Sequence, residues 1–177
     1  MFFFNKQRCR SVLIILIAAL PLSTIAQDLS PNSFCPVKEF QSKQGAVKVW
    51  QQQFEDGVFD LVMAPVNQGE ASTVVRLSFA GSNEPKCHFP EVSLLKGGDW
   101  GWHVAWVSAA KKAVYYVRVD GEAWVSAPPK KMVPNLAEQI SLTASLQKLI
   151  LSYRLINESK IKQLVSEDEG HQFSFLN

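Results

Sequence analysis

The sequence lacks the short motifs that mark most enzymes. It contains no Gly-x-Ser-x-Gly nucleophile motif, no His-Glu-x-x-His zinc motif and no glycine loop of the kind that holds phosphate. A zinc site needs several cysteines or histidines at ligand spacing, and His88 beside Cys87 has no second ligand pair nearby. We therefore predict no catalytic residue, no metal and no cofactor.

Runs of one charge sign are also missing. Three of the 18 basic residues lie in the first ten positions, and without them 15 basic residues face 16 acidic ones, a net charge of −1. We expect the lysine pairs at 111–112 and 130–131 to be solvent-exposed charges in turns. Because nucleic-acid binding needs a basic stripe, the composition argues against a nucleic-acid partner.

One long apolar run lies at the N-terminus. A basic segment precedes an uncharged apolar stretch at 11–20, and small residues lead to Ala26. This order predicts a secretory signal peptide over residues 1–26. The apolar run is shorter than the length that a membrane-spanning helix needs. An uncleaved anchor is the alternative. We expect a mature chain from Gln27 in the periplasm or outside the cell, with no membrane span after cleavage.

Cysteine is scarce, with three residues in the chain. Cys9 falls in the leader, which leaves Cys35 and Cys87 as an even pair in an exported protein. Such a pair predicts one disulfide, which would close a loop of about 50 residues and contribute roughly 3–4 kcal/mol in the chain-entropy model. It would tie an N-terminal segment, residues 27–43, to the folded part of the chain.

The rest of the chain is patterned as short strands. Asp56-Gly57 between Val47–Phe54 and Val58–Ala64 predicts a hairpin, because Asp-Gly permits the positive φ angles of a tight turn. Further strands are expected at Thr73–Phe79, Trp102–Ser108, Ala113–Val119 and Glu122–Ala127, after which Pro128-Pro129 and Pro134 should stop the ladder. The segment 135–165 fits both a helix with an Asn135-x-x-Glu138 cap and a set of strands; we favour strands.

A repeat of 47 to 49 residues relates the two final thirds of the chain. Val92 aligns with Ile140, Trp106 with Tyr153, and Trp124 with Phe173. A period near 50 with about four strands per unit is typical of β-propeller blades. We predict an all-β fold of antiparallel, four-stranded, blade-like units over 44–90, 91–134 and 135–177, the first of which is the least regular.

The final unit carries a motif with a known family likeness. Ser166, Asp168, Gly170 and Phe173 give the spacing Ser-x-Asp-x-Gly-x-x-aromatic, which resembles the Asp-box of sialidase-type β-propellers. The resemblance implies that the Asp side chain caps turn amides and that the aromatic ring packs between neighbouring blades. Asp120-Gly121 stands at the equivalent turn one unit earlier, without the serine. Three units cannot close a ring, so we expect an incomplete ring or an open sandwich.

The resemblance does not extend to catalysis. Catalytic members of that family use three arginines, a Tyr with its Glu, and an acid. Arg76, Arg118 and Arg154 fall one per unit but on non-equivalent strands, and the family's Arg-Ile-Pro motif is absent. A reduced glycosidase-like hydrolase stays an alternative, and it requires these arginines to converge with an acid such as Asp99.

Tryptophans suggest where a partner would bind. Trp100 and Trp102 lie at a glycine-rich strand start, with His103 on the opposite side, and flat aromatic faces hold sugar rings and protein surfaces alike. Packing between blades is the other role, and we favour it for Trp106 and Trp124. We predict an exported, non-catalytic protein that binds a glycan or another exported protein, with a periplasmic inhibitor or immunity protein as one version. A monomer is favoured and a homodimer is the alternative.

Overall fold

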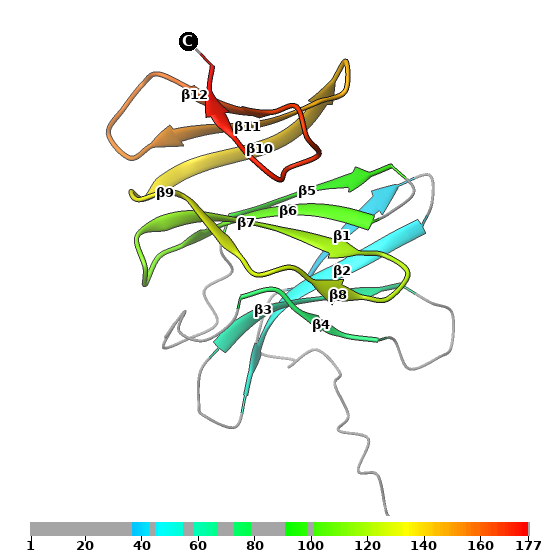
Figure 1. The fold of residues 1–177 in the computed structure, drawn as a ribbon. Coiled ribbons are helices and arrows are strands. Elements are labelled where there is room, and N and C mark those ends of the chain that lie inside the picture. Colours follow the sequence, from blue (N-terminus) through cyan, green and yellow to red (C-terminus); the bar gives the residue numbers. More distant parts are fainter. Residues whose placement is uncertain are drawn as a thin grey trace, which may run out of the picture.

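A computed structural model describes residues 37–42, 45–54, 59–66, 73–78, 91–98 and 101–176. These residues form strands and turns, with no helix among them, and the strands group into three antiparallel sheets (Figure 1). The all-β prediction is therefore confirmed. The leader (1–26), Cys35, Cys87, Asp99 and Trp100 lie outside the described residues, and so does the predicted disulfide.

The N-terminal sheet has the order β1–β2–β3–β4. Its strands are β1 (Lys38–Ser42), β2 (Gly45–Gln53), β3 (Phe59–Pro65) and β4 (Val75–Arg76). The predicted hairpin is present, since β2 pairs with β3 in antiparallel register, Trp50 opposite Val62. The sheet begins at Lys38, inside the segment that we expected to precede the repeats.

The middle sheet has five strands. They are β5 (Val92–Gly97), β6 (Gly101–Ser108), β7 (Ala113–Asp120), β8 (Val125–Ser126) and β9 (Lys130–Val133). Both β8 and β9 pair with β7, so the ladder resumes after Pro128-Pro129, and the prediction that these prolines end it is wrong. The prolines are tolerated because they lie between β8 and β9, where the pairing with β7 is interrupted, so their missing N–H groups fall in a gap of the ladder.

The C-terminal sheet resolves the ambiguity at 135–165 in favour of strands. Its order is β10–β11–β12–β13, with β10 (Ala137–Ser145), β11 (Lys148–Leu155), β12 (Lys162–Ser166) and β13 (Ser174–Phe175). Asn157 has a positive φ of 67° in the turn between β11 and β12. β6 begins at Gly101 and β11 at Lys148, 47 residues later.

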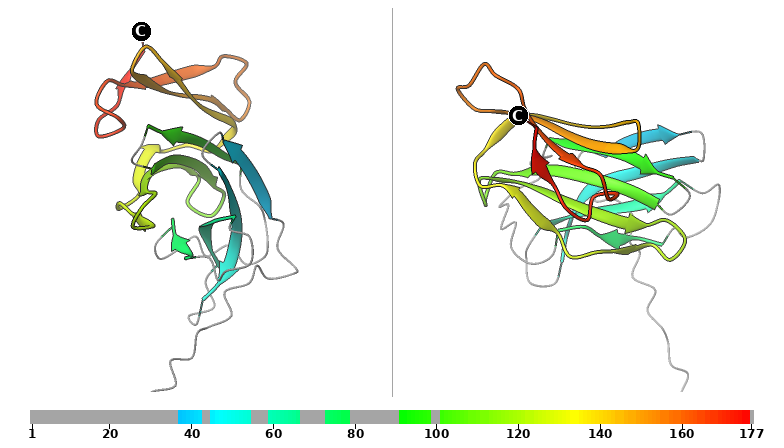
Figure 2. Two further views of the ribbon diagram at one scale, coloured as in Figure 1. Left: turned by 90° about the vertical axis from the view of Figure 1, so that its right-hand side faces the viewer. Right: turned by 45° about the horizontal axis from the view of Figure 1, so that its top comes forward.

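The three sheets stack as layers with the middle sheet between the other two (Figures 1 and 2). One face of β6 carries Trp102, Val104 and Trp106 into a core shared with the N-terminal sheet. Its other face carries Ala105 and Val107 into a core shared with the C-terminal sheet. Every residue of β6 is buried, which explains why its sequence is apolar on both faces.

The outer layer of the stack is more polar. In the C-terminal sheet Ser141 pairs with Ser152 and Ser152 with Gln163, on the face opposite Leu142 and Leu151 of the core. Terminal units of a stacked array need such a face because nothing covers it. The described sheets do not close into a barrel, and this face fits the open end of a stack.

Candidate functional site

The turn between β12 and β13 is built around two polar side chains. Asp168 Oδ1 accepts hydrogen bonds from the Ser166 hydroxyl (2.7 Å) and from the backbone N–H of Gln172 (2.8 Å). The Ser166 oxygen in turn accepts the N–H of Gly170 at 2.8 Å. The bond from Gln172, and next the one from Ser166, lowers the pKa of Asp168. The Asp168 side chain therefore caps the backbone of this turn.

The same turn presses against the middle sheet. Phe173 meets Tyr116 of β7 edge to face, with ring centroids 5.0 Å apart and planes at 71°. Gly170 has a positive φ of 84°, and a Cβ added there would overlap the phenol of Tyr116. Glycine is therefore required both for backbone conformation and for space. The turn joins two layers through Tyr116.

Beneath the turn lies a buried polar pair. His103 of β6 is 5% exposed, and its Nδ1 lies 2.6 Å from the hydroxyl oxygen of Tyr116, which is 0% exposed. Burial, and next the charge of Arg118, lowers the pKa of His103 from 6.5 to about 4. Burial also raises the pKa of Tyr116. Both groups are neutral at neutral pH, which suits a hydrogen-bonded pair inside an apolar core.

The burial of Trp102 disagrees with the exposed, partner-binding position that we predicted for it. Trp102 is 6% exposed and packs in the core between the N-terminal and middle sheets, with Lys96 Nζ 5.5 Å from its ring centre. The exposed aromatic edge that we predicted is therefore not formed by Trp102, and His103 faces Tyr116 instead of solvent. The alternation along β6 placed these side chains on opposite faces, but it could not show that both faces are covered.

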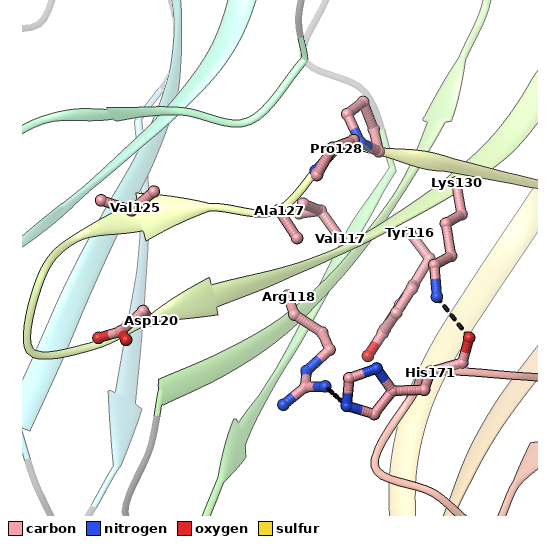
Figure 3. Close-up of a pocket in the computed structure, with 10 residues that line it drawn as sticks. Tyr116, Val117, Arg118, Asp120, Val125, Ala127, Pro128, Lys130 and His171 are labelled. Atoms are coloured by element: carbon pink, nitrogen blue, oxygen red, sulfur yellow. Dashed lines mark hydrogen bonds between the residues drawn. The ribbon is translucent and has the colours of Figure 1, made fainter.

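A pocket of about 510 Å³ opens where the C-terminal turn meets the edge of the middle sheet. Figure 3 shows Arg118, Tyr116, Lys130 and His171 on its polar side. The other side is aliphatic, and the lining there is Val125, Ala127, Pro128 and Pro129. This volume and this mixture of apolar walls with a few polar groups are typical of ligand sites.

Cationic groups hold the turn over this pocket. A guanidinium N–H of Arg118 bonds to Nε2 of His171, and Glu169 lies 3.9 Å from Arg118. Lys130 Nζ donates to the carbonyl oxygens of His171 (2.5 Å) and Gly170 (3.2 Å). Since arginine only donates, His171 Nε2 is the acceptor in this bond.

Sequence reasoning missed this constellation. We expected Lys130 to be ordinary solvated charge and assigned His171 no part in a binding site. The available signal was the alternation along 113–120, which puts Tyr116, Arg118 and Asp120 on one strand face. The contribution of His171 comes from the next unit, so it depends on how the layers stack.

The three arginines do not converge among the described residues. Arg76 of the N-terminal sheet pairs with Asp60, and Arg154 of the C-terminal sheet pairs with Glu138 at 2.8 Å. Arg118 lines the pocket described above, whereas Arg154 lines a separate one beside Tyr153. The glycosidase arrangement, which needs several arginines in one cleft, is not formed by these residues.

The described residues lack two further features. They contain no group of three or more His, Cys, Asp or Glu side chains able to hold a metal ion. They also contain no helix long and apolar enough to cross a membrane.

Comparison with known protein families, with curated proteins and with solved structures finds no match to this chain.

Proposed function

We propose that this protein is an exported, non-catalytic binding protein that recognises a glycan or another exported protein. The observation that carries the proposal is the pocket of about 510 Å³, where Arg118, Lys130 and His171 face an aliphatic wall. Binding pockets combine apolar area with a few well-placed polar groups, and this pocket has both. The site replaces the tryptophan edge as the place of recognition.

The architecture that presents this pocket is, in our proposal, an open stack of sialidase-like blades. Each of the last two sheets is a meander with an Asp-capped turn after its third strand. Each of these turns sends an aromatic residue, Trp124 or Phe173, onto the core shared with the preceding sheet. These features support a common blade-like unit. The predicted disulfide between Cys35 and Cys87 would then cap the first unit.

A monomer is the oligomeric state that we propose. The polar outer face of the C-terminal sheet suits contact with water, whereas closing a ring through a second copy would bury it. Light scattering on the purified protein tests this point. A mass of twice the chain would favour the closed dimer instead.

The binding proposal has a direct test. The full-length sequence is expressed, and the exported protein is purified, immobilised and exposed in parallel to an envelope extract and to a glycan array. We compare the wild type with Arg118→Gln and with Arg154→Gln, a matched loss of charge in the separate pocket. We expect one partner class to be retained by the wild type and Arg154→Gln and lost by Arg118→Gln. Retention of neither class by the wild type would overturn the proposal.

The glycosidase alternative is tested independently. Turnover of a fluorogenic sialoside by the wild type, abolished in Arg118→Gln, would show that the protein is not merely a binding protein. We expect no turnover, because the pocket offers one arginine and a tyrosine whose burial holds it protonated.

A further inference from the structure

The pocket's aliphatic side distinguishes between the two partner classes. Val125 is 59% exposed, and with Ala127, Pro128 and Pro129 it forms a wall without an aromatic ring. Among the described residues of the lining the large aromatic side chain is that of Tyr116, which is fully buried. Sugar sites depend on flat aromatic faces, which this wall lacks, whereas an aliphatic side chain of a polypeptide packs readily against such a surface.

The polar side favours a carboxylate. Arg118 carries a planar fork of donors that suits a two-oxygen acceptor. Its contacts with the turn include the imidazole of His171 and the carboxylate of Glu169, which is 65% exposed and 3.9 Å away. Both residues lie on the turn, at its solvent side. A ligand carboxylate would take over this acceptor role at a closer distance.

The charged side chains around the pocket favour a ligand with a single negative charge. Arg118 and Lys130 are opposed by Asp120 and Glu169, so the surroundings are close to neutral. The carboxylate of Asp120 is held by the N–H groups of Glu122 (2.8 Å) and Ala123 (2.9 Å), which compensate part of its charge. Because the charge of Asp120 is partly compensated in this way, the pocket matches the single charge of a carboxylate more closely than the two charges of a phosphate dianion.

We propose that this pocket binds a carboxylate of a partner polypeptide, held by Arg118 and Lys130, with a neighbouring aliphatic side chain against Val125 and Pro128. The inference rests on the proposed binding function and names its partner class, a protein. Two sources share this chemistry. One is the carboxylate at a chain end, and the other is an Asp or Glu side chain within a loop.

The test is a titration followed by NMR at the amides of Val125 and Ala127, with the isotope-labelled exported protein. The probes are an acetylated Gly-Gly-Val-Leu peptide with a free carboxylate, the same peptide as an amide, an amidated Gly-Gly-Val-Glu-Leu peptide, and glucuronic acid. We expect at least one carboxylate peptide to bind roughly tenfold or more tightly than the Val-Leu amide, because a charged hydrogen bond is lost in the amide. The preferred peptide identifies the source.

Matched variants keep the result interpretable. Arg118→Gln should reduce affinity for the carboxylate peptide roughly tenfold or more, while Arg154→Gln should leave it unchanged. Binding of both carboxylate peptides no tighter than that of the Val-Leu amide, or equal binding of the preferred peptide by the wild type and Arg118→Gln, would overturn the inference. Preference for glucuronic acid over the peptides would also overturn it, and would leave the broader binding function standing. That function fails only when neither extract nor array gives a partner.

Discussion

The Asp120 turn of the middle sheet and the Asp168 turn of the C-terminal sheet occupy equivalent places in their meanders. Both follow the third strand, and in both an Asp oxygen accepts backbone N–H groups two to four residues onward. Hydrogen bonds from these amides lower the pKa of each carboxyl group. The carboxylate is thus the feature that the two turns share.

The turns differ in what they add to the carboxylate. Asp168 is joined by Ser166, which is 1% exposed and bonds to Gly170, whereas Asp120 has no serine partner. Gly170 lets its turn lie directly on Tyr116 of the neighbouring sheet. The comparison teaches that an Asp alone suffices to close such a turn, while the serine and glycine adapt it to a close contact between layers.

The largest expected effect comes from filling that contact. Gly170→Ala would force a Cβ into the Tyr116 phenol at a positive φ, and we expect a loss of about 3 kcal/mol or more in the free energy of unfolding. Gly45→Ala is the matched control. It also has a positive φ, of 124°, but its Cβ would meet no atom within 4 Å, so a loss of about 1 kcal/mol is expected. Urea denaturation of both variants measures the difference.

If the two alanine variants lose equal stability, backbone conformation alone would account for the glycine, and the turn would not be pressed against the middle sheet. The double variant Gly170→Ala with Tyr116→Phe sharpens the result. Removing the hydroxyl relieves part of the overlap, so the effects of the two substitutions should not add.

A fall in pH should weaken the contact between the Asp168 turn and the middle sheet, because His103 is hydrogen-bonded to Tyr116, on which the turn lies. The folded pKa of His103, about 4, lies below its unfolded value of 6.5, so the unfolded chain takes up this proton first as pH falls. The stability contributed by neutral His103 is therefore present above pH 6.5 and is lost between 6.5 and about 4. Thermal denaturation across this range should show a falling Tm in the wild type and a flatter profile in His103→Gln.

Asp168 and Asp120 lie outside that window. Their folded pKa values are lowered, so their contributions are lost only as pH falls below the ordinary Asp value near 3.9. A wild-type Tm that is constant from pH 6.5 to 4.5 would contradict the buried, neutral state of His103.

The sequence was informative where one segment decides its own structure. Local alternation, turn residues and the repeat period predict three features of the fold. These features are the hairpin of β2 and β3, the strands of 135–165 and the spacing of the turn around Asp168. The alternation along β6 correctly separated Trp102 from His103. Each of these patterns needs only a few neighbouring residues.

The candidate site could not be predicted in the same way. Arg118 and His171 are 53 residues apart and meet only because two sheets stack. Trp102 looked like a binding residue because a tryptophan at a strand start is equally suited to an exposed edge and to a covered core. The edge position of Pro128-Pro129 likewise depends on β8 and β9 having no further partner strand among the described residues, and that is a property of the whole sheet.

Removing the carboxylates compares the two turns directly. We expect Asp168→Ala to lower the Tm more than Asp120→Ala at neutral pH. The first change leaves both the Gln172 N–H and the Ser166 hydroxyl without their acceptor, whereas the second exposes two amides that solvent reaches. An equal or reversed order would mean that Ser166 adds nothing to the C-terminal turn.

The smallest effect concerns the hairpins that precede these turns. The middle sheet joins β6 to β7 by a four-residue turn closed by a bond from Lys112 N–H to the Ala109 carbonyl. The C-terminal sheet joins β10 to β11 by Leu146 and Gln147 alone, both at positive φ (48° and 67°). Leu146 is 92% exposed, so it gains no burial in return for this strained backbone.

Two-residue hairpin turns with positive φ at both positions favour Asn-Gly. We therefore expect Leu146→Asn with Gln147→Gly to raise the free energy of unfolding by about 1 kcal/mol, without changing ligand binding at the distant pocket. Denaturation midpoints and the peptide titration measure the two parts. Leu146 is almost fully exposed, so a loss of stability in the double variant would show that the leucine side chain makes a stabilising contact that its exposure does not suggest. A loss of partner capture with stability retained would instead place Leu146 in a binding surface of its own.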